Sequence, residues 1–140
     1  MKILLPVDGS AHSDRATQYV IRLVQGCAGH EILLLNVQEP IDAPELRGHL
    51  PASEIEAMQE TRGGDALASA RALLDRAGIA HVPEVAIGPI IRTIAARAAE
   101  GGFDAIVMGS HGAGKLGSVL MGSVTSGVIH LTDRPVTVVK

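Results

Sequence analysis

Short apolar runs alternate with segments of helical periodicity along almost the whole chain, and this alternation limits the possible folds more than any other feature. Five runs resemble buried strands in length and composition: residues 2–7, 31–38, 79–87, 103–108 and 135–139. Apolar residues at helical spacing separate them. This alternation predicts a parallel sheet covered by helices. The continuous apolar character of the runs supports that prediction, because strands in such sheets are buried on both faces.

The sequence therefore predicts an α/β fold in a single domain, residues 1–140. We expect a five-stranded parallel sheet of order 3-2-1-4-5, with helices on both faces. Hydrophobic residues make up 46% of the chain, which is enough for one sizeable core. Pro83 favours an edge position for the third strand, because proline cannot donate a hydrogen bond to a neighbouring strand.

The first helix is predicted to begin at a cap supplied by Ser10 and Ser13 and to end at Gly29. Cys27 falls on the apolar side of that helical pattern, so we expect a buried thiol. We also expect Met108 and Met121 to lie in the core.

A second helix is predicted to begin at a capping box formed by Ser53 and Glu56 and to end near Ala77. The pair Gly63-Gly64 lies inside it, where each glycine costs about 1 kcal/mol relative to alanine, so a kink is possible. Residues 39–52 carry three prolines and are expected to form a loop.

A glycine-rich loop at residues 108–123 follows the fourth predicted strand. In sheets of this order, ligands bind beyond the carboxyl ends of the strands where the order reverses, here between strands 1 and 4. Asp8 ends the first strand and Gly109 ends the fourth, so both fall at that point. Asp8 could instead, or in addition, cap the first helix.

Glycine lets a ligand approach the backbone closely, and consecutive free amides form a concavity that suits anions. The helix that follows opens with Ser123, Val124 and Thr125, and its amino terminus adds a partial positive charge. Phosphate is therefore the ligand group that this loop favours.

Two familiar glycine motifs fit the loop poorly. Residues 109–115 almost match a P-loop, but Leu116 stands where a hydroxyl should hold Mg²⁺. Residues 112–117 match G-x-G-x-x-G, but the strand that should end in an acidic residue is followed only by Lys140. Lys115 is more typical of a solvated loop lysine than of a phosphate ligand.

A third spacing, G-x2-G-x9-G-[ST], is complete at Gly109, Gly112 and Gly122-Ser123. With this spacing the sequence resembles the universal stress protein family. The resemblance also rests on I-L-L-P-V-D-G-S near the start, S-D at 13–14, L-L-L-N-V-Q, V-M-G-S-H-G, L-M-G-S-V-T-S-G-V-I and the final R-P-V-T-V-V-K. It covers essentially all 140 residues.

The resemblance implies a Rossmann-like fold of the adenine nucleotide alpha hydrolase type and a site for ATP. It assigns to that site Pro6, Val7, Asp8, Val37, Met108, Gly109, Gly112, Gly122, Ser123, Val124 and Thr125. The glycines and Ser123 would cradle phosphates and ribose, and the backbone of Val37 would meet adenine. Asn36 departs from the family, which more often has histidine there.

The function implied is that of a small cytoplasmic regulatory protein of the stress response that binds ATP with about micromolar affinity. Mg²⁺ could accompany ATP, held by phosphates and Asp8. The alternatives are a slow ATPase or autophosphorylating enzyme, and an interaction module that needs no nucleotide; no catalytic residue is assigned. The resemblance also implies a homodimer through the last strand, Val136 to Val139.

Composition argues against several other classes of protein. The net charge is −3, no basic stripe is visible and aromatic residues make up 1%, so we expect no nucleic-acid partner. No apolar run approaches the roughly 20 residues of a membrane span. The six histidines include no pair four residues apart, which argues against a transition-metal site. Ser110 lacks the sequence context of a serine-hydrolase nucleophile.

Overall fold

Five parallel strands form one sheet in a computed structural model that describes residues 1–41, 44–112 and 121–140. The strands are β1 (Lys2–Pro6), β2 (Glu31–Gln38), β3 (Val82–Ile87), β4 (Ala105–Gly109) and β5 (Val136–Val139). Their order is β3-β2-β1-β4-β5, and every paired neighbour runs parallel, which confirms the predicted sheet. The edge position predicted from Pro83 is also confirmed, because β3 is an outer strand.

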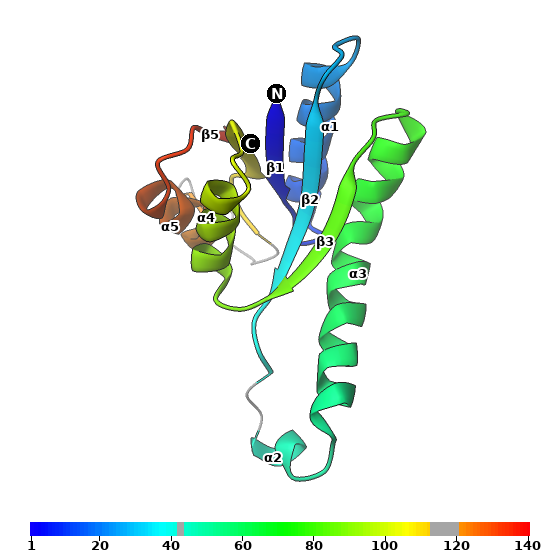
Figure 1. The fold of residues 1–140 in the computed structure, drawn as a ribbon, viewed down its shortest axis with the longest axis vertical. Coiled ribbons are helices and arrows are strands. Elements are labelled where there is room, and N and C mark those ends of the chain that lie inside the picture. The colour runs from blue at the N-terminus through cyan, green and yellow to red at the C-terminus, as the bar shows by residue number, and fades with distance from the viewer. Residues whose placement is uncertain (42–43, 113–120) are drawn as a thin grey trace.

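The helices are α1 (Ala11–Val24), α2 (Pro44–Arg47), α3 (Ala52–Arg76), α4 (Ile90–Glu100) and α5 (Ser123–Leu131). Figure 1 shows α1 and α3 on one side of the sheet and α4 and α5 on the other. Among the helices that the structure describes, none has the length and apolar character needed to cross a bilayer.

Alternation of side chains along β1 divides the core into two clusters. Ile3 and Leu5 point to one face and pack with buried residues of α1 and α3, such as Val20 and Leu67. Leu4 points to the other face and packs with residues of α4 and α5 that include Ile94. Both faces of β1 are thus buried, which is the reason that this strand is apolar throughout.

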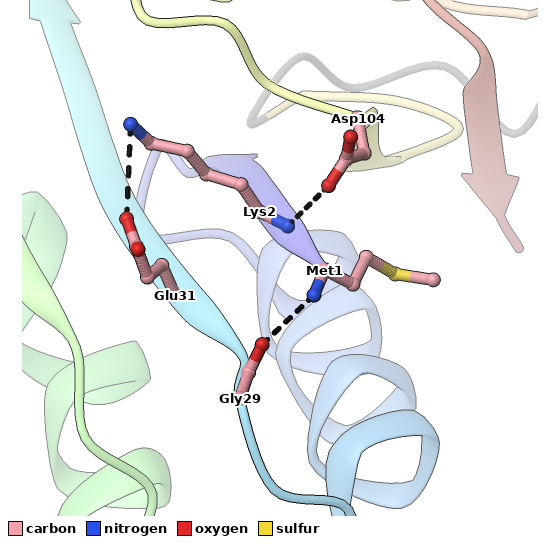
Figure 2. A network of polar contacts seen from close by, with 5 residues as sticks. All are labelled: Met1, Lys2, Gly29, Glu31 and Asp104. Carbon is pink, nitrogen blue, oxygen red and sulfur yellow. Dashed lines mark hydrogen bonds and ion pairs between the residues drawn. The ribbon is translucent and has the colours of Figure 1, made fainter.

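Polar contacts join the chain at the amino ends of the central strands, far from the glycine loop (Figure 2). The backbone N–H of Lys2 donates to Asp104 Oδ2 at 2.7 Å, and its ammonium lies 3.7 Å from Glu31 Oε2. The amino group of Met1 donates to the carbonyl of Gly29 at 2.9 Å. Asp104 therefore lies at the opposite end of β4 from the candidate ligand site.

The first helix is shorter than predicted. Ser10 is its amino-terminal cap, as expected, and accepts a hydrogen bond from the Ser13 N–H. The helix ends at Val24 rather than near Gly29, so the prediction of a buried Cys27 is wrong and its thiol is exposed. Gly26 has a φ of +79°, a left-handed conformation that ends the helical pattern before Cys27 reaches the core.

The predicted capping box is also wrong. The amino-terminal cap of α3 is Pro51, which makes no side-chain cap bond, and the helix begins before Ser53. Proline suits this place because it fixes φ and its missing N–H has no role there. Between residues 39 and 52, predicted as a loop, the structure contains the short helix α2.

The glycine pair in α3 causes no break, because the helix is continuous from Ala52 to Arg76. Gly63 is buried against the sheet, where an added Cβ would lie 2.7 Å from Val85 Cγ2. Gly64 faces open space. Gly63 thus lets α3 lie close to β3, at the expense of helix propensity.

These environments predict opposite effects for two alanine substitutions. Gly63→Ala should lower the free energy of unfolding by about 1–2 kcal/mol, because overpacking outweighs the gain in helix propensity. The matched control Gly64→Ala should raise it by about 0.5–1 kcal/mol. Urea unfolding followed by circular dichroism measures both, and similar values for the two variants would contradict the packing described here.

Candidate nucleotide site

A pocket opens at the carboxyl ends of β1 and β4, where the strand order reverses. Its lining comes from the ends of β1, β2 and β4, from α4 and from the first turn of α5. Its volume is about 120 Å³. A pocket thus lies at the place where the sequence predicts a ligand site.

One wall of the pocket is apolar. Val37 lies near the end of β2, Ile90 and Ile94 belong to α4, and Met108 lies near the end of β4. Met108 is buried, as predicted, whereas the prediction of a buried Met121 is wrong because that side chain is 46% exposed. An apolar slot of this kind suits a flat heterocycle better than it suits phosphate.

Asn36 also lines the pocket and joins the ends of two strands. Its Nδ2 donates to the carbonyl of Val7 at 2.7 Å, and its Oδ1 accepts from Gln38 Nε2 at 2.7 Å. The side chain is buried. The asparagine that departs from the family pattern is thus satisfied within the protein.

Asp8 connects the end of β1 to the start of α1. Its Oδ1 accepts from the Ser10 N–H at 3.0 Å and from Ser13 Oγ at 2.7 Å. The Asp8 N–H in turn donates to Ser13 Oγ at 3.0 Å. Asp8 also lines the pocket, so it stabilises the helix start and faces the candidate site at once.

The motif glycines bring three segments into close contact. An added Cβ on Gly109 would lie 2.8 Å from the Cβ of His12, and one on Gly112 would lie 2.8 Å from Asp8 Oδ2. An added Cβ on Gly122 would lie 3.1 Å from the Cα of His111. Packing within the protein therefore already requires small residues at these positions, apart from any ligand.

The first turn of α5 places amides without intrahelical partners next to the pocket. The Ser126 N–H donates to the carbonyl of Gly122 at 3.0 Å, so the amides of Ser123, Val124 and Thr125 precede the first bond of the helix. The Gly122 N–H itself donates to the carbonyl of Ser110 at 2.8 Å. The amide of Gly122 is therefore already bonded within the protein, unlike a helix-start amide that still needs an acceptor.

Most of the residues assigned from the sequence line this one pocket; Gly122 and Ser123 do not, and lie beside it. The sequence assignment missed Ser13, Leu35, Asn36, Ile90, Ile94 and His111. A polar residue within the apolar run of β2 was a usable signal for Asn36, and the apolar face of α4 was one for the two isoleucines. Lys115 lies outside the described residues.

A histidine pair lies at the glycine end of the pocket. His111 lines the pocket, and its Nδ1 lies 3.0 Å from Ser110 Oγ. The ring of His12, at the start of α1, has its centroid 5.3 Å from that of His111. Desolvation, and then the charges of Arg15 and His111, lower the pKa of His12, while Asp8 acts in the opposite direction.

An open parallel sheet with a pocket at its order reversal defines the class of doubly wound α/β ligand-binding domains. Within this class, the model of the universal stress protein family matches residues 1–140, and the chain belongs to that family. A universal stress protein of Mycolicibacterium smegmatis is 29% identical over 145 residues, covering 98% of this chain and 47% of its own length. The chain thus spans about half the length of that relative.

Solved structures agree with the fold. Protein MJ0577 of Methanocaldococcus jannaschii is 29% identical with a TM-score of 0.82, and the match covers 99% of this chain and 94% of that one. A universal stress protein in complex with cAMP has 18% identity and a TM-score of 0.73, covering 100% and 97%. An Arabidopsis thaliana family member with AMP bound has 17% identity and a TM-score of 0.68, covering 100% and 91%.

A buried hydroxyl joins the end of β4 to α5. Thr125 Oγ1 donates to the carbonyl of Gly109 at 2.8 Å, and the side chain is buried. Thr125→Val should therefore lower the free energy of unfolding by about 1–2 kcal/mol, because the carbonyl loses its donor. Thr61→Val is the matched control, since Thr61 Oγ1 donates to the carbonyl of Ala57 on an exposed helix face, and should cost less than about 0.5 kcal/mol. Equal losses in chemical denaturation would show that the Thr125 bond does not stabilise the loop.

Proposed function

We propose that this chain is an ATP-binding regulatory protein of the universal stress class that acts in the cytoplasm. The proposal rests on one pocket in which an apolar slot lies next to the first turn of α5. The slot suits adenine, and the free amides at the helix start suit phosphate. Two structural relatives that hold cAMP and AMP support an adenine nucleotide as the ligand class.

The size of the pocket also bears on the ligand. A volume of about 120 Å³ is well below the roughly 300–1,000 Å³ of sites that enclose a whole drug-sized ligand. The pocket would therefore hold the base, and the ribose and phosphates would extend along Ser123 and the glycine loop. Asp8 Oδ1 already accepts two hydrogen bonds, so a Mg²⁺ that accompanied ATP would be held mainly by phosphate oxygens.

Filling the apolar slot should abolish nucleotide binding. Ile90→Trp places an indole beside the pocket and should weaken ATP at least 10-fold in isothermal titration calorimetry, since the base loses its place. Leu23→Trp adds the same side chain at an exposed position of α1, away from the pocket, and should leave affinity unchanged.

Thermal melting provides an independent measurement. ATP at about 100 times its dissociation constant should stabilise the native protein by about 2.7 kcal/mol, which raises Tm by several degrees. Absence of a shift with ATP, together with no adenine nucleotide released when the purified protein is heat-denatured, would favour an interaction module that needs no nucleotide.

We also propose a homodimer through β5. The carbonyls of Pro135 and Val139 accept hydrogen bonds from the N–H groups of Ile106 in β4 and of Ser110 just after it. Because backbone groups alternate in direction along a strand, those of Val136 and Val138 point away from β4, toward the outer edge of the sheet. An edge of this kind can pair with a second copy. Val138→Pro should therefore dissociate the dimer in analytical ultracentrifugation and leave the circular dichroism spectrum unchanged. Wild-type protein that sediments as a monomer at tens of micromolar would argue against the dimer.

A second candidate function is slow phosphoryl transfer. The hydrogen bond between Ser110 Oγ and His111 Nδ1 favours it, because it places a base beside a hydroxyl at the pocket. Steady release of inorganic phosphate from ATP that disappears in Gly122→Val, or phosphate incorporated into the protein, would support this candidate.

A further inference from the structure

A guanidinium and two imidazoles lie together at the glycine end of the pocket. Arg15 Nη2 lies 2.7 Å from His12 Nδ1, one turn apart on α1. The rings of His12 and His111 have centroids 5.3 Å apart and are tilted by 48°. Of these three residues only His111 lines the pocket. The contacts thus run from an exposed arginine, through one histidine, to a second histidine at the site.

The contact with Arg15 fixes the role of His12. A guanidinium can only donate, so Nδ1 of His12 accepts, and the ring carries its proton on Nε2. The lowered pKa of His12, caused by desolvation and by the charges of Arg15 and His111, agrees with a neutral ring. His12 is therefore a neutral N–H donor that is hydrogen-bonded to a permanent positive charge.

The histidine pair is held in place from two sides. The backbone of His12 packs so closely on Gly109 that a Cβ there would lie 2.9 Å from its carbonyl oxygen. His111 is held by its contact with Ser110, whose side chain is buried at the end of β4. The pair therefore belongs to the packed junction of α1 and β4 rather than to a loose surface.

The negative charge of Asp8 at the pocket makes a nearby cation or N–H donor favourable for binding phosphates. Among the described residues that line the pocket, the ionisable side chains are Asp8 and His111. A carboxylate at this place repels phosphate, and a helix terminus contributes only about half a positive charge. Each phosphate added to a nucleoside brings further negative charge, so the cost of binding without a cation rises from AMP to ATP.

We propose, on the basis of the nucleotide site proposed above, that Arg15, His12 and His111 together set the preference of the site for ATP over AMP. Arg15 acts as a positioning residue through His12, whose ring lies against that of His111, and His111 faces the terminal phosphates. The helix turn of α5 serves the phosphate that ATP and AMP share, so it does not separate them.

The test compares dissociation constants of ATP and AMP by isothermal titration calorimetry without divalent metal. Arg15→Gln keeps an amide donor and removes the charge. It should weaken ATP about 5-fold and AMP less than about 2-fold, an effect expected for a charge near a partly solvated site. Arg15→Lys keeps both charge and donor and should restore the wild-type ratio to within about 2-fold. Arg22→Gln, in the last turn of the same helix, should change neither constant.

A double-mutant cycle distinguishes an effect of Arg15 that depends on His12 from an effect that Arg15 has on its own. His12→Asn keeps the Cβ that packs on Gly109 and removes the imidazole. If Arg15 acts through His12, the double variant should weaken ATP by no more than about the larger single effect. Circular dichroism and thermal melting of each variant verify that the fold is intact.

The outcomes distinguish this inference from the proposed function. A wild-type protein that binds neither nucleotide overturns both. Binding of both nucleotides with no preference for ATP, or an equal loss of ATP and AMP in Arg15→Gln, overturns the role of the three residues and leaves the nucleotide site standing. Additive losses in the cycle overturn the relay through His12. A selective loss of ATP, rescued by lysine, supports the proposal.

Discussion

The pairing of β1 with β2 on one side and with β4 on the other is the constraint on which the rest of the structure depends. Ile3, Leu4 and Leu5 are completely buried, so this strand cannot move without disturbing both halves of the core. Because the order reverses at β1, the segments that leave β1 and β4 diverge, and the pocket lies where they part. Asp8 and Gly109, the two residues at that point, are both fixed to the start of α1, the first by hydrogen bonds and the second by close packing.

The glycines of the loop have two roles that a motif alone does not separate. Gly109, Gly112 and Gly122 each lie close to another part of the chain, which a larger side chain would crowd, most severely at Gly109 against the backbone of His12. The same close packing brings the first turn of α5 up to the pocket, where its amides are free of intrahelical partners. Packing and the proposed ligand binding therefore both favour glycine at these positions, and a substitution at any of them would affect both.

Strand order and pocket location could be predicted from the sequence because they depend on the strongest signals, which are the apolar runs and the order reversal that they imply. The wrong predictions concern helix ends, where a local sequence signal differs from the path that the backbone takes. Helical spacing continued to Cys27, but a left-handed Gly26 ends the pattern first. The capping box at Ser53 was locally plausible, yet α3 already begins after Pro51. The spacing of Ile90 and Ile94 is typical of one apolar helix face, but their place in a pocket wall depends on where α4 lies against β2, which the local sequence does not specify.

The length of α3 has a consequence for how the molecule can vary. Its 25 residues extend about 37 Å, whereas the eight residues of β2 extend about 26 Å. Its first buried side chain is Gln59, which donates to the carbonyl of Glu39, so the turns before it project past the sheet together with α2 (Figure 1). Whole turns could be added or removed there without changing strand register or the pocket. This projecting arm is therefore the part of the chain where evolution can alter reach and surface chemistry while the ligand-binding end stays the same.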